Sequence, residues 1–468
     1  MLLKYFYDDK LAHASYMVGC QRTGEAVIVD AGRDVQQYLD AAAAEDMRIV
    51  GAADTHIHAD YVSGARELAE RVGAKLFVSD EGDENWKYEY AHQYDHQLLK
   101  DGDTFTVGNI KFEVFYSPGH TPEHIAFMIT DMGGGADKPM GMFTGDFIFV
   151  GSIGRPDLLE KAAGIANTAV PGAYKQFESI QRFKQLPDYL QVWPAHGAGS
   201  ACGKGLGAIP SSTIGYEKMF NPMLQYDNAS EFVEALLDGQ PEAPGYFAVM
   251  KYVNKVGPVI MGDKPLPSKL DVAGLSELVA SGAQVLDTSA ESAFANGHVP
   301  GTMNISIKNL AVWSGWLVNY KQPLYLISSP NDLPEAVRVL AKVGIEDVVG
   351  YYDADEAAAA GLMTQSYTVK HAQEIADQII NGEVTVVDVR AESEWEENRL
   401  PNAQHIMLGY LAKRADEVIN GKPIVVMCRT GNRSGIAASL LQAQGAKEVI
   451  NLAGGIVEWK QAGLPVEK

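Results

Sequence analysis

The chain has 468 residues, and 38 lysines and arginines stand against 60 aspartates and glutamates, so its formal net charge is −22. This length predicts two to four domains, and the acid excess argues against nucleic acid or an anionic membrane as a partner, because both would repel the chain. The three cysteines, Cys20, Cys202 and Cys428, lie far apart, which excludes a disulfide-stapled secreted scaffold. We find no signal peptide and no apolar stretch of about 18 residues. We therefore expect a cytoplasmic protein without a membrane span.

The first 240 residues alternate strand-like segments with Gly-rich turns. Residues 25–32 predict a buried strand, residues 34–47 have the composition of a helix, and residues 48–56 return to a strand. Further strands are predicted over residues 111–120, 124–131 and 141–151. This order of elements predicts a layered α/β or α+β domain. The Pro/Gly-punctuated segment that follows, residues 246–268, predicts a linker.

A unit of about 100 residues then occurs twice. Residues 285–305 correspond to residues 386–406, and each copy continues into a strand, a loop, a helix and a last strand. This pattern predicts two small parallel α/β domains, over residues 269–362 and 366–468. Cys428 in the second copy corresponds to Ser328 in the first, so only one copy carries a thiol at this place.

Candidate metal ligands follow four predicted strands of the first domain. Residues 55–61 are THIHADY, and later come His120 in SPGHTPEH, Asp146 in MFTGDFIF and His196 in WPAHG. An isolated histidine more often satisfies a structural hydrogen bond than binds a metal. Here four strand ends in succession carry imidazole or carboxylate groups, which suit zinc, iron or manganese. The sequence therefore predicts one metal site where these strand ends converge.

These motifs resemble the metallo-β-lactamase superfamily, whose signature is HxHxDH followed by a later His, Asp and His. The resemblance covers roughly residues 1–240 and implies an αββα sandwich over a domain of residues 1–245. Tyr61 replaces the last histidine of the signature, which in two-metal members serves the second ion. The resemblance therefore implies a weakened second site and a mononuclear centre.

The sequence around these motifs is most similar to the persulfide dioxygenase branch of that superfamily. This resemblance implies one Fe(II) per chain, held by His56, His120 and Asp146, with zinc as the alternative metal. Two histidines and one carboxylate on one face of iron leave positions for dioxygen and a substrate sulfur. The other motif residues would then orient ligands or waters, and these are His58, Asp60 and His196. For His58, the role of a further metal ligand also stays open.

Two other residues of this domain, Arg155 and Cys202, have two interpretations each, and Cys20 has one. Arg155 could hold a substrate carboxylate or phosphate, or could form a surface or interdomain salt bridge. Cys202 lies in a Gly-rich loop six residues after His196, where it could accept sulfur with its pKa lowered by Lys204, or could be a small structural residue. Cys20, within a strand-like segment, is expected in the core.

Cys428 opens the loop CRTGNRS between a predicted strand and a helix. Backbone N–H groups, the helix dipole and the charges of Arg429 and Arg433 favour a thiolate, which predicts a nucleophile. The loop resembles that of single-domain rhodanese sulfurtransferases, whose six-residue loop fits a persulfide sulfur. In the first copy Ser328 has no basic neighbour and Pro330 removes an N–H donor, so we expect a silent rhodanese-like domain.

Together the resemblances imply a persulfide dioxygenase coupled to a sulfurtransferase that acts in sulfide detoxification. The expected partners are a low-molecular-weight thiol persulfide, dioxygen, and sulfite or thiosulfate, and we expect a homo-oligomer. Sulfur could pass from Cys428 to sulfite, or from thiosulfate to a thiol. Two alternatives are a zinc-dependent thioester hydrolase of the glyoxalase II kind, which needs a dinuclear site, and a non-catalytic sulfur carrier.

Overall fold

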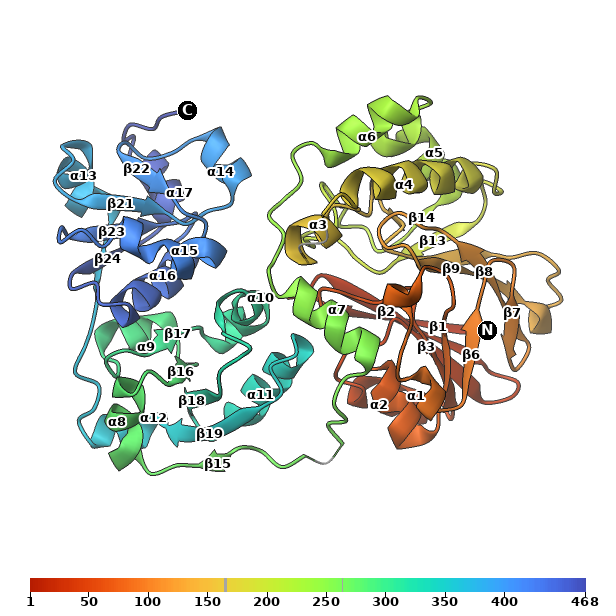
Figure 1. Cartoon of the computed structure of the whole chain (residues 1–468), viewed down its shortest axis with the longest axis horizontal. Helices are drawn as coiled ribbons and strands as arrows, with labels where there is room; N and C mark the ends of the chain where they lie inside the picture. Colours follow the sequence, from red (N-terminus) through yellow and green to blue (C-terminus); the bar gives the residue numbers. More distant parts are fainter. Residues whose placement is uncertain (164–165, 263) are drawn as a thin grey trace. The chain divides into compact units, whose positions relative to one another are not determined.

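A computed structural model describes residues 1–163, 166–262 and 264–468 of the chain. The chain separates into two compact units, one of Met1–Lys264 with Ala341–Gly344, and one of Pro265–Leu340 with Ile345–Lys468 (Figure 1). Within the described residues, no helix combines the length and the apolar character that crossing a membrane requires. Each unit is built on β-sheets covered by helices, so the predicted α/β class is confirmed.

Two mixed sheets form the centre of the first unit. One runs in the order β1-β2-β3-β4-β5-β6, with β1 Leu2–Asp8, β2 His13–Cys20, β3 Glu25–Val29, β4 Arg48–Ala53, β5 Lys75–Ser79 and β6 His96–Leu99. The other runs in the order β14-β13-β10-β9-β8-β7, with β7 Thr104–Val107, β8 Ile110–Tyr116, β9 Ile125–Asp131, β10 Gly141–Gly145, β13 Gln191–Pro194 and β14 Ser212–Thr213. A short hairpin pairs β11 Ile148–Phe149 with β12 Ser152–Ile153. These strands confirm those predicted from residue 25 to residue 151.

Apolar side chains of the facing sheets form the central core of this unit, including Val18, Phe112 and Phe127. Helices cover the outer faces, because separate apolar clusters join each sheet to its own helices (Figure 1). Helices α1 Gln36–Ala44 and α2 Ala65–Val72 lie on the first sheet, and α4 Ala169–Phe183 and α6 Ala229–Leu237 on the second. Among the described residues, the other α-helices before residue 240 are α3 Leu158–Ala163 and α5 Ile214–Phe220. The predicted αββα sandwich is thus confirmed.

The loops that carry the metal-site motifs leave the ends of β4, β8, β10 and β13. Gly145 ends β10 with a φ of 50°, and a Cβ there would lie 2.5 Å from Oγ1 of Thr55. Only glycine permits this close approach of two strand ends in that conformation. The backbone itself therefore brings Asp146 next to the loop of His56.

The segment predicted as a linker, residues 246–268, differs from that prediction over its first part. Helix α7 Phe247–Val256 lies within the first unit, and its side chains Phe247, Met250 and Asn254 are buried. Their spacing of three and four residues is that of the buried face of a helix, which the surrounding Pro and Gly residues obscured. Residue 263 of the predicted linker lies outside the described residues.

The second unit contains two sheets of identical topology. Their orders are β15-β19-β18-β16-β17 and β20-β24-β23-β21-β22, and all pairs are parallel. The strands are β15 Ser268–Lys269, β16 Gln284–Asp287, β17 Met303–Asn304, β18 Leu324–Ser328, β19 Val348–Asp353, β20 Thr368–Lys370, β21 Thr385–Asp388, β22 Ala403–His405, β23 Ile424–Met427 and β24 Val449–Leu452.

Helices cover both of these sheets, and the two copies pack against each other within the unit. The helices are α8 Leu275–Ala280, α9 Glu291–Asn296, α10 Ile307–Leu317, α11 Leu333–Lys342, α12 Ala354–Ala359, α13 Ala372–Ile380, α14 Glu392–Glu397, α15 Leu408–Arg414, α16 Asn432–Ala443 and α17 Gly455–Gln461. The backbone N–H of Asn304 donates to Oγ of Ser439 at 2.9 Å, and the rings of Trp316 and Tyr410 meet edge to face. The internal repeat of the sequence is therefore a repeat of structure.

Candidate metal centre and thiol loop

His56, His120 and Asp146 meet in the interior of the first unit, and their side chains are at most 3% exposed. One ligand atom from each lies within 4.8 Å of the others, and Nε2 of His120 is 3.4 Å from Oδ2 of Asp146. Nε2 of His56 and both carboxylate oxygens of Asp146 are buried without a hydrogen-bond partner. Buried polar atoms without partners are rare in folded proteins. Two imidazoles and a carboxylate in this arrangement fit one divalent transition metal.

Neighbouring groups fix the orientation of these side chains. Nδ1 of His120 donates to the carbonyl of Arg155 at 3.0 Å, and Nδ1 of His56 lies 3.0 Å from Oγ1 of Thr55. Burial lowers the pKa of both His56 and His120, which keeps the imidazoles neutral. Neutral imidazoles held through Nδ1 present the Nε2 lone pair toward the centre of the cluster.

Asp60, His196 and Cys202 form a second group of donors, again with ligand atoms within 4.8 Å of one another. Nε2 of His196 lies 3.2 Å from Oδ2 of Asp60 and 3.4 Å from Oδ1 of Asp146, so the two groups adjoin. Nδ1 of His196 donates to the carbonyl of Ala12 at 3.0 Å, which leaves Nε2 facing the two carboxylates. The sequence places Cys202 six residues after His196, but its position beside Asp60 and His196 was not predicted.

The thiol of Cys202 is buried, and its surroundings differ from the prediction. Burial, together with the charges of Asp60 and Asp146, raises the pKa of Cys202 well above its ordinary value. Lys204, expected to lower that pKa, instead directs Nζ toward the carbonyl of Asp238 at 3.4 Å. Of the two interpretations of Cys202, the thiol with a lowered pKa disagrees with the structure, because burial and the neighbouring carboxylates act in the opposite direction. Cys20 is buried between the sheets, as predicted.

His58 belongs to a third group of donors, which it forms with Asp30 and Asp54. Its Nε2 lies 3.1 Å from Oδ1 of Asp30, while Nδ1 is buried without a hydrogen-bond partner. Burial opposes the charged imidazole, but Asp30, Asp54 and Asp60 outweigh it and raise the pKa of His58 to about 9. Burial also raises the pKa of Asp54 to about 7. With the pKa raised in this way both ring nitrogens of His58 carry a proton, so Nδ1 could serve as a further ligand only after losing that proton.

Tyr61 supports these loops without joining either donor group. Its ring packs on His13 with centroids 3.8 Å apart and on His58 at 4.5 Å, and its hydroxyl is 3.4 Å from the carbonyl of Asp30. The residue that replaces the last histidine of the signature therefore contributes packing to the site and no ligand.

Arg155 is buried, with 0% of its side chain exposed. Its guanidinium makes two hydrogen bonds of 2.6 and 2.7 Å to Asp157, and also donates to the carbonyls of Ala201 and Pro241. A guanidinium engaged in this way has no free edge for a substrate. The geometry disfavours substrate binding by this side chain, and the salt bridge is buried within the first unit instead of lying at the surface or between domains.

Sequence reasoning missed several residues that hold the site together. Asn254 of α7 bonds to the carbonyls of His58 and Tyr61 and to the N–H of Ser63. His124 accepts a hydrogen bond from the N–H of Asp146 at 3.1 Å. The SPGHTPEH motif already contains His124, so its position was a usable signal, whereas nothing local marks Asn254.

Cys428 lies at the end of β23, and the helix α16 begins four residues later. The N–H of Gly431 donates to Sγ of Cys428 at 3.1 Å, and Oγ of Ser434 donates at 3.4 Å. Gly431 has a φ of 101°, which turns its N–H back toward the thiol. The loop thus surrounds the sulfur with donors, as an anion-binding nest does.

The two arginines of this loop differ in their surroundings. Arg433 forms a two-pronged ion pair with Glu394, with bonds of 2.6 and 2.8 Å, so part of its charge is already compensated. Arg429 is exposed, and the described residues offer its guanidinium no ion pair. Of the two charges expected to act on Cys428, only that of Arg429 is free to meet an incoming anion.

The corresponding loop of the first copy is built differently. Oγ of Ser328 is buried and accepts a hydrogen bond from Oγ1 of Thr288 at 2.9 Å. Asp388 of the second copy pairs with Arg390, whereas its counterpart Asp287 accepts from the N–H of Ser289. The first copy therefore lacks both the thiol and the adjoining buried ion pair.

Comparison with known proteins agrees with this geometry. Residues 8–196 match the family model described as the metallo-beta-lactamase superfamily. The crystal structure of a metallo-beta-lactamase from Staphylococcus aureus subsp. aureus COL is 40% identical, with a TM-score of 0.67, over 98% of that chain and 75% of this one. The chain belongs to the metallo-beta-lactamase superfamily. Residues 371–462 of this superfamily member match the model of a rhodanese-like domain.

Relatives of this metallo-beta-lactamase superfamily member carry different descriptions. A beta-lactamase hydrolase-like protein of Xylella fastidiosa (strain 9a5c) is 30% identical over 49% of this chain and 53% of its own, so the chain spans about half of that relative. The mitochondrial persulfide dioxygenase ETHE1 of Bos taurus is 26% identical over 50% of this chain and 80% of its own. These two relatives therefore differ in the activity that their names describe.

Proposed function

We propose that the protein is an iron-dependent persulfide dioxygenase joined to a sulfurtransferase. The observation that carries the proposal is the buried cluster of His56, His120 and Asp146, whose unpartnered donors fit a single metal. Iron held there would supply dioxygen activation, with open positions for a sulfur ligand. The likeness to a persulfide dioxygenase over 80% of that relative supports this choice of reaction.

The reaction balances as RSSH + O2 + H2O → RSH + SO3(2−) + 2 H+, so the outer sulfur is oxidised and dioxygen is reduced. His56 and His120, kept neutral by burial, orient their lone pairs, and Asp146 provides the anionic donor. His196 and Asp60 adjoin the cluster, where they can hold water or take up the released protons. Burial of the whole cluster excludes bulk water.

The second half of the proposal concerns Cys428. A thiolate surrounded by donors from Gly431 and Ser434 attacks the outer sulfur of thiosulfate, sulfite leaves, and a cysteine persulfide remains. A thiol then takes that sulfur, and the sum is S2O3(2−) + RS− → SO3(2−) + RSS−. In the reverse direction sulfite accepts the sulfur. We propose that the first copy, without a thiol, is a silent rhodanese-like scaffold.

The proposed site of action is a reducing compartment, in which the thiols stay free. Cys20, Cys202 and Cys428 are all unpaired. Their low number and wide separation support this proposal.

Metal content and oxygen uptake test the first half directly. Protein purified without oxygen is expected to hold about one iron per chain and to consume oxygen with a thiol persulfide. About two zinc ions per chain and hydrolysis of a thioester would contradict the proposal. The adjoining group of Asp60, His196 and Cys202 favours this second candidate, a zinc-dependent hydrolase, because it could hold a second ion.

A further inference from the structure

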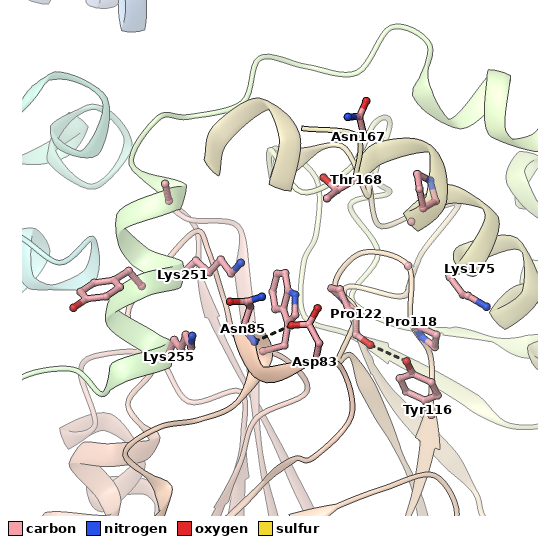
Figure 2. A pocket seen from close by; sticks show the side chains of 16 residues that line it. Asp83, Asn85, Tyr116, Pro118, Pro122, Asn167, Thr168, Lys175, Lys251 and Lys255 are labelled. Atoms are coloured by element: carbon pink, nitrogen blue, oxygen red, sulfur yellow. Dashed lines mark hydrogen bonds between the residues drawn. The ribbon is translucent and has the colours of Figure 1, made fainter. Parts of the chain in front are cut away.

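A cleft of about 610 Å3 lies in the first unit between α4, α7 and the loops that follow β5 and β8. Its volume is in the range of small-molecule sites. Figure 2 shows Lys251 and Lys255 extending from α7 on one side of the cleft, and Lys175 on α4 on the other. Asp83 is also part of its wall.

Three ammonium groups around one cleft are notable in a chain with a net charge of −22. The chain as a whole repels anions, so an anionic ligand needs a local concentration of positive charge. Two of the lysines are held by ion pairs, the exposed Lys175 with Glu178 at 2.8 Å and the partly buried Lys255 with Glu89 at 3.1 Å. The exposed pair of Lys175 is worth little energy and can exchange for a ligand.

Of the three lysines, Lys251 is the one whose positive charge has no ion-pair partner among the described residues. Its Nζ lies 3.5 Å from the centroid of the buried Trp86 ring, which fixes its position by a cation–π contact. None of the ion pairs found in the described part of the chain involves Lys251. Burial lowers the pKa of Lys251, so an anion that partners the ammonium would relieve this penalty.

The cleft reaches the loops of the metal centre. Pro118 and Gly119 belong to its wall and directly precede His120. Glu123, which feels the charge of Lys251, accepts a 2.7 Å hydrogen bond from the N–H of Ile57, next to His56. A ligand in the cleft therefore lies against the loop that carries His120, and Glu123 of that loop is hydrogen-bonded to the loop of His56.

We propose that this cleft binds the anionic part of the thiol that carries the persulfide, through Lys175, Lys251 and Lys255. The inference rests on the proposed dioxygenase function and names the class of its substrate, a thiol with carboxylate or phosphate groups. Carboxylates and phosphates share the chemistry that ammonium groups recognise. A thiol without carboxylate or phosphate groups cannot make these contacts with the three lysines.

The test measures oxygen uptake by the full-length, iron-loaded protein with three persulfides, those of glutathione, coenzyme A and uncharged 2-mercaptoethanol. Lys251→Gln is expected to raise KM roughly tenfold for the anionic persulfides, the loss of one charge-assisted hydrogen bond. Lys175→Gln, a change at an exposed position that leaves the fold intact, is expected to raise KM several-fold. In both variants the preference for the anionic persulfides over the uncharged persulfide is expected to fall as KM rises.

Lys111→Gln is the matched control, because Lys111 is a half-exposed lysine of β8 outside the cleft and the change in net charge is the same. If KM rises more for glutathione persulfide, the lysines bind carboxylates. If KM rises more for coenzyme A persulfide, they bind phosphates. Equal KM changes in Lys251→Gln and Lys111→Gln, or equal changes for charged and uncharged persulfides, would overturn the inference.

A separate readout distinguishes failure of the cleft from failure of the proposed function. If no persulfide drives oxygen uptake in the unaltered protein, the dioxygenase proposal fails. Calorimetry with glutathione and coenzyme A then tests the cleft alone. Binding that is weakened about tenfold by Lys251→Gln but not by Lys111→Gln supports the inference, and absence of binding by either thiol overturns it.

Discussion

The carbonyl of Arg155 accepts a 3.0 Å hydrogen bond from Nδ1 of His120. Since a carbonyl can only accept, the proton lies on Nδ1 and the Nε2 lone pair of His120 faces Asp146. The guanidinium of the same arginine is buried and paired with Asp157. Arg155 thus orients a proposed metal ligand through its main chain and stabilises the surrounding loops through its side chain.

Replacing Arg155 with alanine is expected to destabilise the first unit by about 3 kcal/mol, because the buried Asp157 loses its main partner. Lys161 still pairs with that carboxylate at 2.9 Å and limits the loss. Denaturant unfolding measures the change. Arg182→Ala, which removes an exposed pair with Asp101, is the control and should cost less than about 1 kcal/mol. A rise in KM without any loss of stability would instead indicate substrate binding by Arg155.

Replacing His120 with alanine removes one of three proposed ligands. We expect iron affinity to fall by roughly 10–100-fold or more and oxygen uptake to be lost, while sulfur transfer from thiosulfate continues. Metal analysis and an oxygen electrode measure the first two, and thiocyanate or sulfite release measures the third. His92→Ala, at an exposed position, serves as the control. Unchanged iron content in His120→Ala would contradict the proposed ligand set.

Replacing Cys428 with serine is expected to abolish sulfur transfer, because the hydroxyl has no general base and cannot carry a persulfide. Oxygen uptake with a persulfide should remain. Mass spectrometry of the protein after incubation with thiosulfate should show one added sulfur in the unaltered chain and none in Cys428→Ser. Persistent transfer in this variant, but not in Cys202→Ser, would move the carrier role to Cys202.

Glu123 makes the stability of the first unit depend on pH. Burial raises the pKa of Glu123 from 4.5 to about 7, so between these values the folded chain binds a proton that the unfolded chain has released. The free energy of unfolding therefore falls as pH rises through this window. Glu123→Gln removes the titration, and we expect a gain of roughly 2–3 kcal/mol above pH 7.5 that shrinks below about 1 kcal/mol near pH 5.

Urea unfolding of Glu123→Gln and its parent at both pH values checks this expectation. Glu84→Gln, at an exposed position of the neighbouring loop, provides a control that should show no pH-dependent difference. A gain of equal size at both pH values would mean that the titration of Glu123 is not its source.

Much of the architecture could be predicted from local patterns. Buried runs such as residues 25–29 and the helical composition of residues 36–44 mark their elements, and the repeat marks the shared topology of the second unit. Helix α7 was missed because Pro and Gly residues on either side mask a short apolar stripe. Its anchor, Asn254, acts on residues almost 200 positions earlier, and no local pattern reports such a contact.

The sequence by itself determined which chemical groups follow each strand, since imidazole, carboxylate and thiol side chains can be read directly. It also determined that only the second copy carries a thiol, at Cys428. Tertiary structure alone decided how these groups are used. In the folded chain Arg155 is buried and paired with Asp157, Arg433 is paired with Glu394, and Cys202 lies near carboxylates. Charge and burial at one residue depend on chain segments far away in sequence, and only packing brings those segments together.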